Sequence, residues 1–171
     1  KVTKRNGQLE DVKFDKVTRR LTALCQGLDD VQPSDITQEV VQNMYDNIPT
    51  SQVDELSADT AMARAWKEPQ YEMLAIRLLC DNMRKMAPKS FWISVKKCWD
   101  NGMMDDQVFK WIKENKEELN SIVDMSRDVG LTFFGLKTLM RSYLITVDGS
   151  LLETPQYMWL RVACAIHWPH M

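Results

Sequence analysis

The sequence lacks the long apolar run of a membrane span and the cysteine spacing of a disulfide scaffold. None of its 171 residues falls in a stretch approaching the roughly 18 apolar residues of a transmembrane helix, and the longest apolar patch, residues 73–80, is interrupted by Arg77. Four cysteines are present without a CxxC pair, and they lie in apolar helical patterns. We therefore expect reduced packing cysteines in a cytoplasmic protein with neither a signal peptide nor a membrane anchor.

Glycine-rich phosphate loops are also missing. The sequence contains neither GxGxxG nor GxxxxGK followed by Ser or Thr, so nothing in it supports phosphoryl transfer or a dinucleotide site. The two histidines, His167 and His170, have no neighbouring carboxylate or cysteine partner, and we expect no metal site. The formal net charge is only −2 and the basic residues are not interleaved with stacking aromatics, so we expect no nucleic-acid partner.

The first sixteen residues carry the clearest positive signal. Two short β-prone runs flank Asn6-Gly7, and this dipeptide favours a type I′ hairpin turn because both central positions need positive φ. Residues 1–20 contain seven basic and three acidic side chains, a local net charge of +4. A helix is expected to begin at Asp15, and its free N–H groups beside these cations suit an anion such as a polyphosphate. The alternative is a solvated basic hairpin without a ligand.

Four helices are expected in the remainder of residues 1–86. The first runs from Asp15 to Gly27 with its arginines on the solvent face, and the second opens at Pro33 and ends near residues 47–49. The third follows Thr50-Ser51, with Ser51 and Asp54 in a capping box, and the fourth begins at Glu68-Pro69 and is apolar nearly all round. These elements predict a mainly α fold with a small β-hairpin, an α+β domain with its own core.

A boundary is expected near Ala87-Pro88, and the chain beyond it is again mostly helical. Periodicity predicts helices over residues 89–99, 105–119, 136–144 and 155–167, a loop over 121–130 and a second hairpin over 144–153. No internal repeat and no low-complexity segment is present.

Several motifs in order resemble one family. The pattern VxKRxGxxExVxFDK at Val2 to Lys16 is similar to the signature of the ATP-cone, the allosteric domain at the start of many ribonucleotide reductase large chains. The resemblance continues over nearly the whole chain, with LCxGL (24–28), Thr50 and Asp54, PxYxxLAxR (69–77), RD (127–128), FGxKTLxRSYL (134–144) and ETPQxMxxRVxxxIH (153–167). It is strongest at the two ends, and it points to class I large chains of the eukaryotic or viral kind.

The resemblance implies an organisation and a function. Residues 1–86 would be the ATP-cone, a four-helix bundle capped by a β-hairpin, and residues 87–171 a helical segment leading into a catalytic barrel that lies downstream. The region would bind ATP as activator and dATP as inhibitor, with Mg²⁺, and so control ribonucleoside-diphosphate reduction for DNA replication. This part alone is expected to be inactive, because the family's catalytic cysteines lie beyond it.

The resemblance also implies a set of binding residues. Lys4, Arg5 and Lys85 would approach the triphosphate. Adenine and ribose would be enclosed by a second group, namely Glu10, Asp11, Val12, Lys13, Phe14, Asp15, Lys16, Thr50 and Asp54. A triphosphate brings about four negative charges, and fixed cations bridge it without a glycine-rich loop.

Each of these positions also has a purely structural interpretation. Thr50 and Asp54 fit the start of a helix, and Lys85 fits a helix C-terminus, where the dipole favours a cation. Glu10 and Asp15 fit a strand-edge charge and an N-cap. The chain departs from the family pattern at Cys80-Asp81 and Met83-Arg84, just before Lys85, and matches it poorly over residues 89–108, which bears on the stringency of the site.

The expected partners follow from the family. They are ATP and dATP, the rest of the large subunit, further copies of it in a homo-oligomer, and the small radical-generating subunit. A nucleotide-sensing repressor with an ATP-cone would need zinc-binding cysteine pairs near the cone, and these are absent. The alternative that stays open is a degenerate ATP-cone that acts only as an oligomerisation or docking module.

Overall fold

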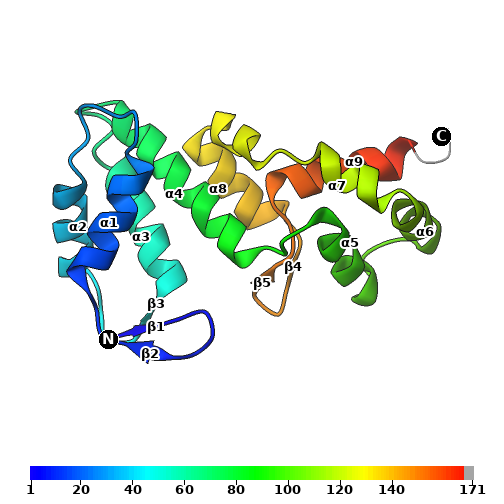
Figure 1. The fold of residues 1–171 in the computed structure, drawn as a ribbon, viewed down its shortest axis with the longest axis horizontal. Helices are drawn as coiled ribbons and strands as arrows, with labels where there is room; N and C mark the ends of the chain where they lie inside the picture. Colours follow the sequence, from blue (N-terminus) through cyan, green and yellow to red (C-terminus); the bar gives the residue numbers. More distant parts are fainter. Residues whose placement is uncertain (168–171) are drawn as a thin grey trace. The chain divides into compact units, whose positions relative to one another are not determined.

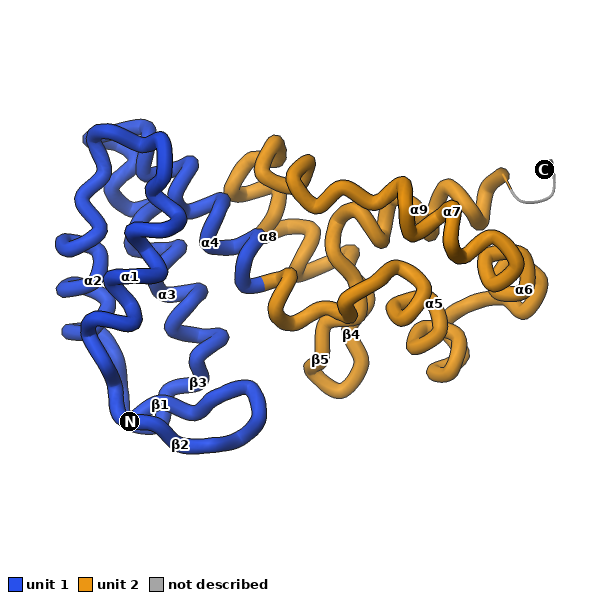
Figure 2. Tube along the Cα trace, in the orientation of Figure 1, with its two compact units in different colours: residues 1–82 blue, residues 83–171 orange. Residues whose placement is uncertain are grey.

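The computed structural model describes residues 1–167. The chain forms two compact units, residues 1–82 and residues 83 onward (Figure 2). Helices predominate in both, and every strand of the described part is two residues long. The expected mainly helical fold with small β-sheets is therefore confirmed, whereas His170 lies outside the described residues.

The N-terminal hairpin is present, but its turn is not the expected type. Strands β1 (Val2–Thr3) and β2 (Leu9–Glu10) pair antiparallel. The Gly7 N–H donates to the Lys4 carbonyl at 2.9 Å, and Gly7 has φ +81° while Asn6 stays at negative φ. The hairpin loop thus has three residues, 5–7, and the four-residue turn 4–7 ends on the left-handed glycine, so the type I′ prediction is wrong here.

A third strand completes the sheet. Strand β3 (Ile48–Pro49) lies parallel to β1, with Ile48 opposite Val2 and Pro49 opposite Thr3. The second helix, α2 (Pro33–Gln42), therefore ends several residues earlier than its periodicity predicts. Asn47 adopts φ +63° and its N–H donates to the Lys1 carbonyl at 2.9 Å, which turns the chain out of the helix and into the sheet.

Helices α1 (Phe14–Leu24), α3 (Thr50–Met62) and most of α4 (Gln70–Met86) complete the first unit, which ends at Asn82 within α4. The sheet lies at one end of α1, α2 and α3 (Figure 1). The α4 segment supplies fully buried side chains at Leu74, Leu78 and Leu79, as its continuous apolar pattern predicts. The expected capping box of Ser51 and Asp54 is wrong. Helix α3 begins one residue after Pro49, its N-cap, and no side chain of the described residues caps it.

The described part of the second unit, up to His167, contains five further helices, a 3-10 helix and a hairpin. They are α5 (Phe91–Asp100), α6 (Asp106–Glu114), α7 (Lys116–Ile122), η1 (Met125–Gly130), α8 (Phe133–Ser142), β4 (Thr146–Val147), β5 (Ser150–Leu151) and α9 (Pro155–His167). The predicted helix 105–119 is divided at Asn115, and the predicted loop 121–130 contains η1. The second hairpin is confirmed, and its Asp148 and Gly149 both have positive φ, as a type I′ turn requires.

Aromatic packing and one buried ion pair hold the second unit together. The rings of Trp99 and Phe109 stack with centroids 4.3 Å apart. Glu153 is buried, pairs with Arg161 of α9 and accepts the Ile145 N–H at 3.1 Å, which ties the hairpin to the last helix. Because a buried carboxylate needs such partners, this contact fixes how the hairpin meets α9.

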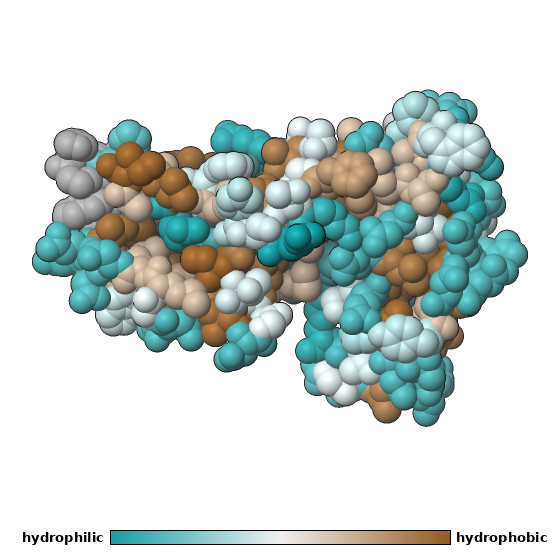
Figure 3. All heavy atoms as spheres, turned by 180° about the vertical axis from the view of Figure 1, so that it is seen from behind, coloured by the Kyte–Doolittle hydropathy of each residue, from teal (hydrophilic) through white to brown (hydrophobic). Residues whose placement is uncertain are grey.

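The surface is mixed in polarity. All four cysteines are buried, in keeping with a packing role. Apolar patches interrupt the hydrophilic surface (Figure 3), and on α9 the side chains of Trp159, Val162 and Ile166 share one exposed face. No helix within residues 1–167 is long and apolar enough to cross a membrane.

The burial of side chains on α4 predicts how substitutions there change the free energy of unfolding. Leu78→Ala removes a fully buried side chain and should lower the free energy of unfolding by about 2–5 kcal/mol. Met73→Ala on the same helix, at a side chain that is 37% exposed, should cost well under half as much. Urea unfolding of both variants measures the difference, and equal losses would contradict the placement of α4 in the core.

Candidate functional site

The pairing of β1 with β3 places the hairpin beside the start of α3. Thr3 is opposite Pro49, and Pro49 directly precedes the first residue of the helix. Because the two strands are parallel, Lys4 and Arg5, which follow β1, lie at the same end of the sheet as the start of α3. The first-turn N–H groups of α3 carry a partial positive charge, so this region favours an anion.

The carboxylate of Asp54 lies at the centre of this region. It sits in the second turn of α3, and its side chain is only 6% exposed. One oxygen, Oδ2, accepts from Nη2 of Arg5 at 2.9 Å, and the other, Oδ1, pairs with Nη1 of Arg20 on α1. Asp54 therefore joins three separate elements of the first unit.

Two side chains of helix α4 also accept hydrogen bonds from these arginines. Nε and Nη2 of Arg20 donate to Oδ2 of Asp81 at 3.0 and 2.5 Å, and Nη2 of Arg5 donates to Oδ1 of Asn82 at 2.6 Å. We call the set of Arg5, Arg20, Asp54, Asp81 and Asn82 the arginine clasp. It connects the hairpin, α1, α3 and α4 through charged or amide groups.

A backbone contact fixes the clasp to the start of α3. Nδ2 of Asn82 donates to the Ser51 carbonyl at 3.2 Å, while its Oδ1 accepts from Arg5. Asn82 is buried, and both ends of its amide thus have partners. This arrangement lets a movement of the hairpin reach the first turn of α3 through a single side chain.

The clasp is electrically balanced. Two guanidinium groups and two carboxylates make a network with no net charge. Burial lowers the pKa of Arg5 and of Arg20, and the nearby Asp81 carboxylate opposes this in both cases. Both arginines keep their charge at neutral pH because the ordinary pKa of a guanidinium group lies far above neutrality.

A second ion cluster lies on the hairpin. Glu10 of β2 pairs with Nζ of Lys4 at 2.5 Å and also with Lys16 of α1. Hydrogen bonds from Lys16 and Lys4 lower the pKa of Glu10 from 4.5 to about 2. The carboxylate therefore holds two of the cations that would attract a phosphate.

The other predicted residues occupy more exposed positions. Asp11, Val12 and Lys13 connect β2 to α1, and Phe14 and Asp15 open that helix, all of them at the surface. Thr50 is the first residue of α3 and is half-buried, and Lys85 is exposed in the last turn of α4, in the second unit. Their roles in binding remain predictions.

Three members of the clasp were not predicted from the sequence. Arg20 was expected on the solvent face of its helix, but it is half-buried between two carboxylates, so that expectation is wrong. Asp81 and Asn82 carry no motif signal, although Asp81 falls within the segment that departs from the family pattern. Only the position of Arg20, three residues after Val17 and next to Leu21 of the apolar stripe, could have hinted at its burial.

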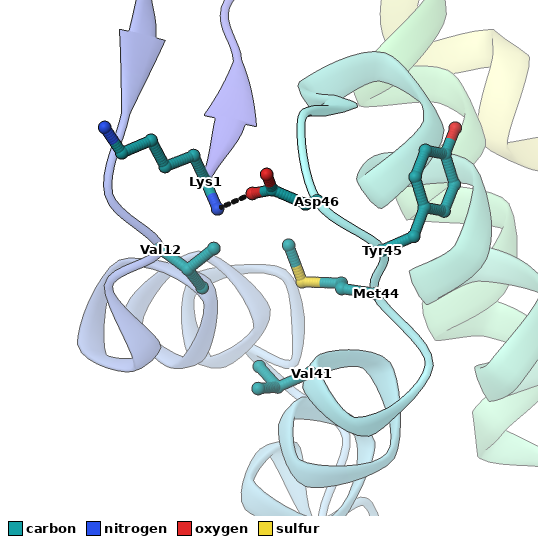
Figure 4. Close-up of a pocket in the computed structure, with 6 residues that line it drawn as sticks. All are labelled: Lys1, Val12, Val41, Met44, Tyr45 and Asp46. Carbon is teal, nitrogen blue, oxygen red and sulfur yellow. Dashed lines mark hydrogen bonds and ion pairs between the residues drawn. The ribbon is translucent and has the colours of Figure 1, made fainter.

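A shallow pocket of about 260 Å³ lies near the sheet, apart from the clasp. Val12 and Met44 point toward each other across it, and Val41 of α2 lies alongside (Figure 4). None of its lining residues belongs to the arginine clasp. Of the predicted binding residues only Val12 contributes, so the charged region and this pocket are different features.

Two known protein families match parts of the chain. The model of the ATP cone domain matches residues 1–86, and that of the ribonucleotide reductase all-alpha domain matches residues 129–170. The chain therefore belongs to the ATP-cone family. Within it, the chain corresponds to the N-terminal ATP-cone and adjoining helical region of ribonucleotide reductase large subunits of the eukaryotic and viral kind, which confirms the resemblance seen in its motifs.

Curated relatives match over almost the whole chain. The ribonucleoside-diphosphate reductase large chain of Schizosaccharomyces pombe is 40% identical, and the large subunit of Arabidopsis thaliana is also 40% identical, each over 97% of this chain and 22% of the relative. The large subunit of monkeypox virus is 34% identical over 97% of this chain and 23% of its own length. The chain thus spans about a fifth of the length of these relatives.

The Glu10 cluster makes a prediction about acid titration. Lys16→Met removes the largest influence on the Glu10 carboxyl and should raise its pKa from about 2 toward 4.5. Because folding lowers this pKa, the pair stabilises the fold above about pH 4.5 and loses that contribution as the pH falls toward 2. Carboxyl-carbon NMR titration measures both effects.

The matched control is Lys13→Met, an exposed lysine in the same segment that is not part of the Glu10 cluster. It should leave the pKa of Glu10 unchanged. A Glu10 pKa near 4.5 in the unaltered chain would contradict the ion cluster.

Proposed function

We propose that this chain is the overall-activity regulatory region of a ribonucleotide reductase large subunit, which binds ATP as activator and dATP as inhibitor, with Mg²⁺. The reductase would convert ribonucleoside diphosphates to deoxyribonucleotides in the cytoplasm. The observation that carries the proposal is the Arg5–Asp54 contact, since it joins the motif-bearing hairpin to α3 beside an uncapped helix N-terminus.

The chemistry of this region suits a nucleoside triphosphate. Lys4 and Arg5 on the hairpin, with Lys85 on α4, are the cations proposed to meet the phosphates, and the uncapped N–H groups of α3 add directed donors. The polar segment from Glu10 to Lys16, together with Thr50 and Asp54, is proposed to enclose adenine and ribose. Because no phosphate loop is present, the nucleotide acts as an effector and not as a substrate.

The switch must respond to a single hydroxyl group. ATP and dATP differ only at the ribose 2′ position, and allosteric coupling energies are typically about 1–3 kcal/mol. The arginine clasp offers a route for such a difference, because Asp54 and Asn82 connect the hairpin to α3 and α4. We propose that ATP favours an active assembly with the small radical-generating subunit and that dATP favours an inactive homo-oligomer of large subunits.

The rest of the large subunit is a further proposed partner. The exposed apolar face of Trp159, Val162 and Ile166 on α9 supports this, because that helix carries the motif that leads into the catalytic barrel in the family. Apolar surface of this kind is stabilised when another domain covers it.

One observation favours the alternative of a degenerate cone that acts only in docking. Lys4, Arg5, Lys16 and Arg20 are each already paired with a carboxylate of the same unit. A triphosphate therefore has to displace internal anions before it gains these contacts, and a cone that cannot do so would serve only as a docking or oligomerisation element.

Calorimetric titration with ATP and with dATP in the presence of Mg²⁺ separates the two functions. The allosteric proposal predicts roughly micromolar dissociation constants for both nucleotides. Lys4→Ala or Lys85→Ala should weaken binding at least about tenfold, whereas Lys113→Ala, an exposed lysine on α6, should not. Absence of binding to the folded chain would overturn the allosteric proposal and favour the docking module.

A further inference from the structure

The two oxygens of Asp54 face arginines that are held in different ways. Oδ2 contacts Arg5, whose other partner is the neutral amide of Asn82. Oδ1 contacts Arg20, whose other partner is the charged carboxylate of Asp81, reached through both Nε and Nη2. Arg20 therefore forms ion pairs with two carboxylates. Arg5 is paired with Asp54, and the Asp81 carboxylate acts on it electrostatically.

The two arginines also differ in access to solvent. The side chain of Arg5 is 34% exposed and lies in the hairpin turn, next to Lys4, while that of Arg20 is 25% exposed and lies on α1. An incoming phosphate therefore reaches Arg5 more readily. Guanidinium groups form paired hydrogen bonds with phosphate oxygens, so Arg5 has a strong competing partner once a nucleotide arrives.

Transfer of Arg5 to a phosphate has a consequence for Asp54. The carboxylate is 6% exposed, and a buried charge that loses its partner is strongly destabilised. Arg20 is placed to prevent this outcome, because it pairs with the other carboxylate oxygen, Oδ1. The contact with Asp81 holds Arg20 in position for that task.

We propose that Arg20, held by Asp81, is a positioning residue that keeps the buried Asp54 paired while Arg5 turns from Asp54 to the phosphates of the bound nucleotide. This inference rests on the proposed function, and it adds a residue that binds no part of the nucleotide. It also explains how a site in which Lys4 and Arg5 are already paired with carboxylates remains able to accept a triphosphate.

The test uses calorimetric titration of the 171-residue chain with MgATP. Arg20→Gln should raise the dissociation constant about tenfold, because Arg5 then has to stay with Asp54. The double variant Arg20→Gln/Asp54→Asn should bind within about twofold of Asp54→Asn alone, since no buried charge is left to protect. The matched control is Arg19→Gln, which removes the same charge from an exposed position on the same helix.

A charge-conserving variant helps to separate weaker nucleotide binding from loss of folding. Arg20→Lys keeps the cation but cannot span Asp54 and Asp81 with one planar group, so it should weaken MgATP binding by a smaller factor in the same direction. Circular dichroism and thermal unfolding of each variant without nucleotide show that the chain is folded.

Four results would overturn the inference. They are unchanged affinity in Arg20→Gln, unchanged affinity in Arg20→Lys, an equal loss in Arg19→Gln, and a double variant that binds much more weakly than Asp54→Asn alone. The last result would mean that Arg20 contacts the nucleotide or serves the fold alone. If the unaltered chain binds no nucleotide, the proposed function itself fails and the inference falls with it. The two failures are therefore distinguishable in one set of titrations.

Discussion

The pairing of one buried carboxylate with two arginines is the interaction on which the first unit depends. Asp54 needs cationic partners because it is almost inaccessible to water, and the chain supplies them from a hairpin turn and from α1. The requirement explains why Asp81 and Asn82 face the same place from α4, since each fixes one of the arginines. Four elements are thus joined by polar contacts at the end of the unit where the sheet lies, in addition to the apolar packing of α4.

The same arrangement relates binding to conformation. A ligand that takes Arg5 breaks a contact between the hairpin and α3, and through Asn82 it also affects a contact with α4. A second exchange of ion-pair partners is possible at Glu10, because its pairing with Lys4 and Lys16 competes with any phosphate that approaches those lysines. In this account, an anionic effector alters the connections between elements whenever it binds, which is the property that an allosteric region needs.

Much of the architecture could be predicted from periodicity and turn residues. The stripe of Ile36 and Val40 predicted α2, the apolar run around Leu78 predicted the buried α4, and Asp148-Gly149 predicted the second hairpin. The strand at Ile48–Pro49 could not be predicted, because two residues show no alternation and their pairing with β1 spans more than forty residues of sequence. Helix ends at Gln42 and Asn115 were set by local backbone turns that apolar spacing does not encode.

The residues of the site were likewise only partly predictable from the sequence. The family pattern named Arg5 and Asp54, and the structure brings their side chains into contact. Arg20, Asp81 and Asn82 were missed because a charged residue on an amphipathic helix normally faces solvent, and only the tertiary packing of α1 against its neighbours shows which arginine is enclosed. Partners that come from separate helices carry no spacing signal in a single sequence.

The most direct test of this account is the nitrogen-15 NMR spectrum of the arginine guanidinium groups, recorded on the chain with and without MgATP. Without nucleotide, the Nε–H of Arg20, which donates to Asp81, and the Nη2–H groups of Arg5, which donate to Asp54 and Asn82, should be protected from solvent exchange. On addition of MgATP, the Arg5 signal should move to a new position while the Arg20 signal stays nearly where it was. Rapid exchange at both arginines in the free chain, or an Arg20 signal that shifts as far as that of Arg5, would contradict the central role given to Asp54.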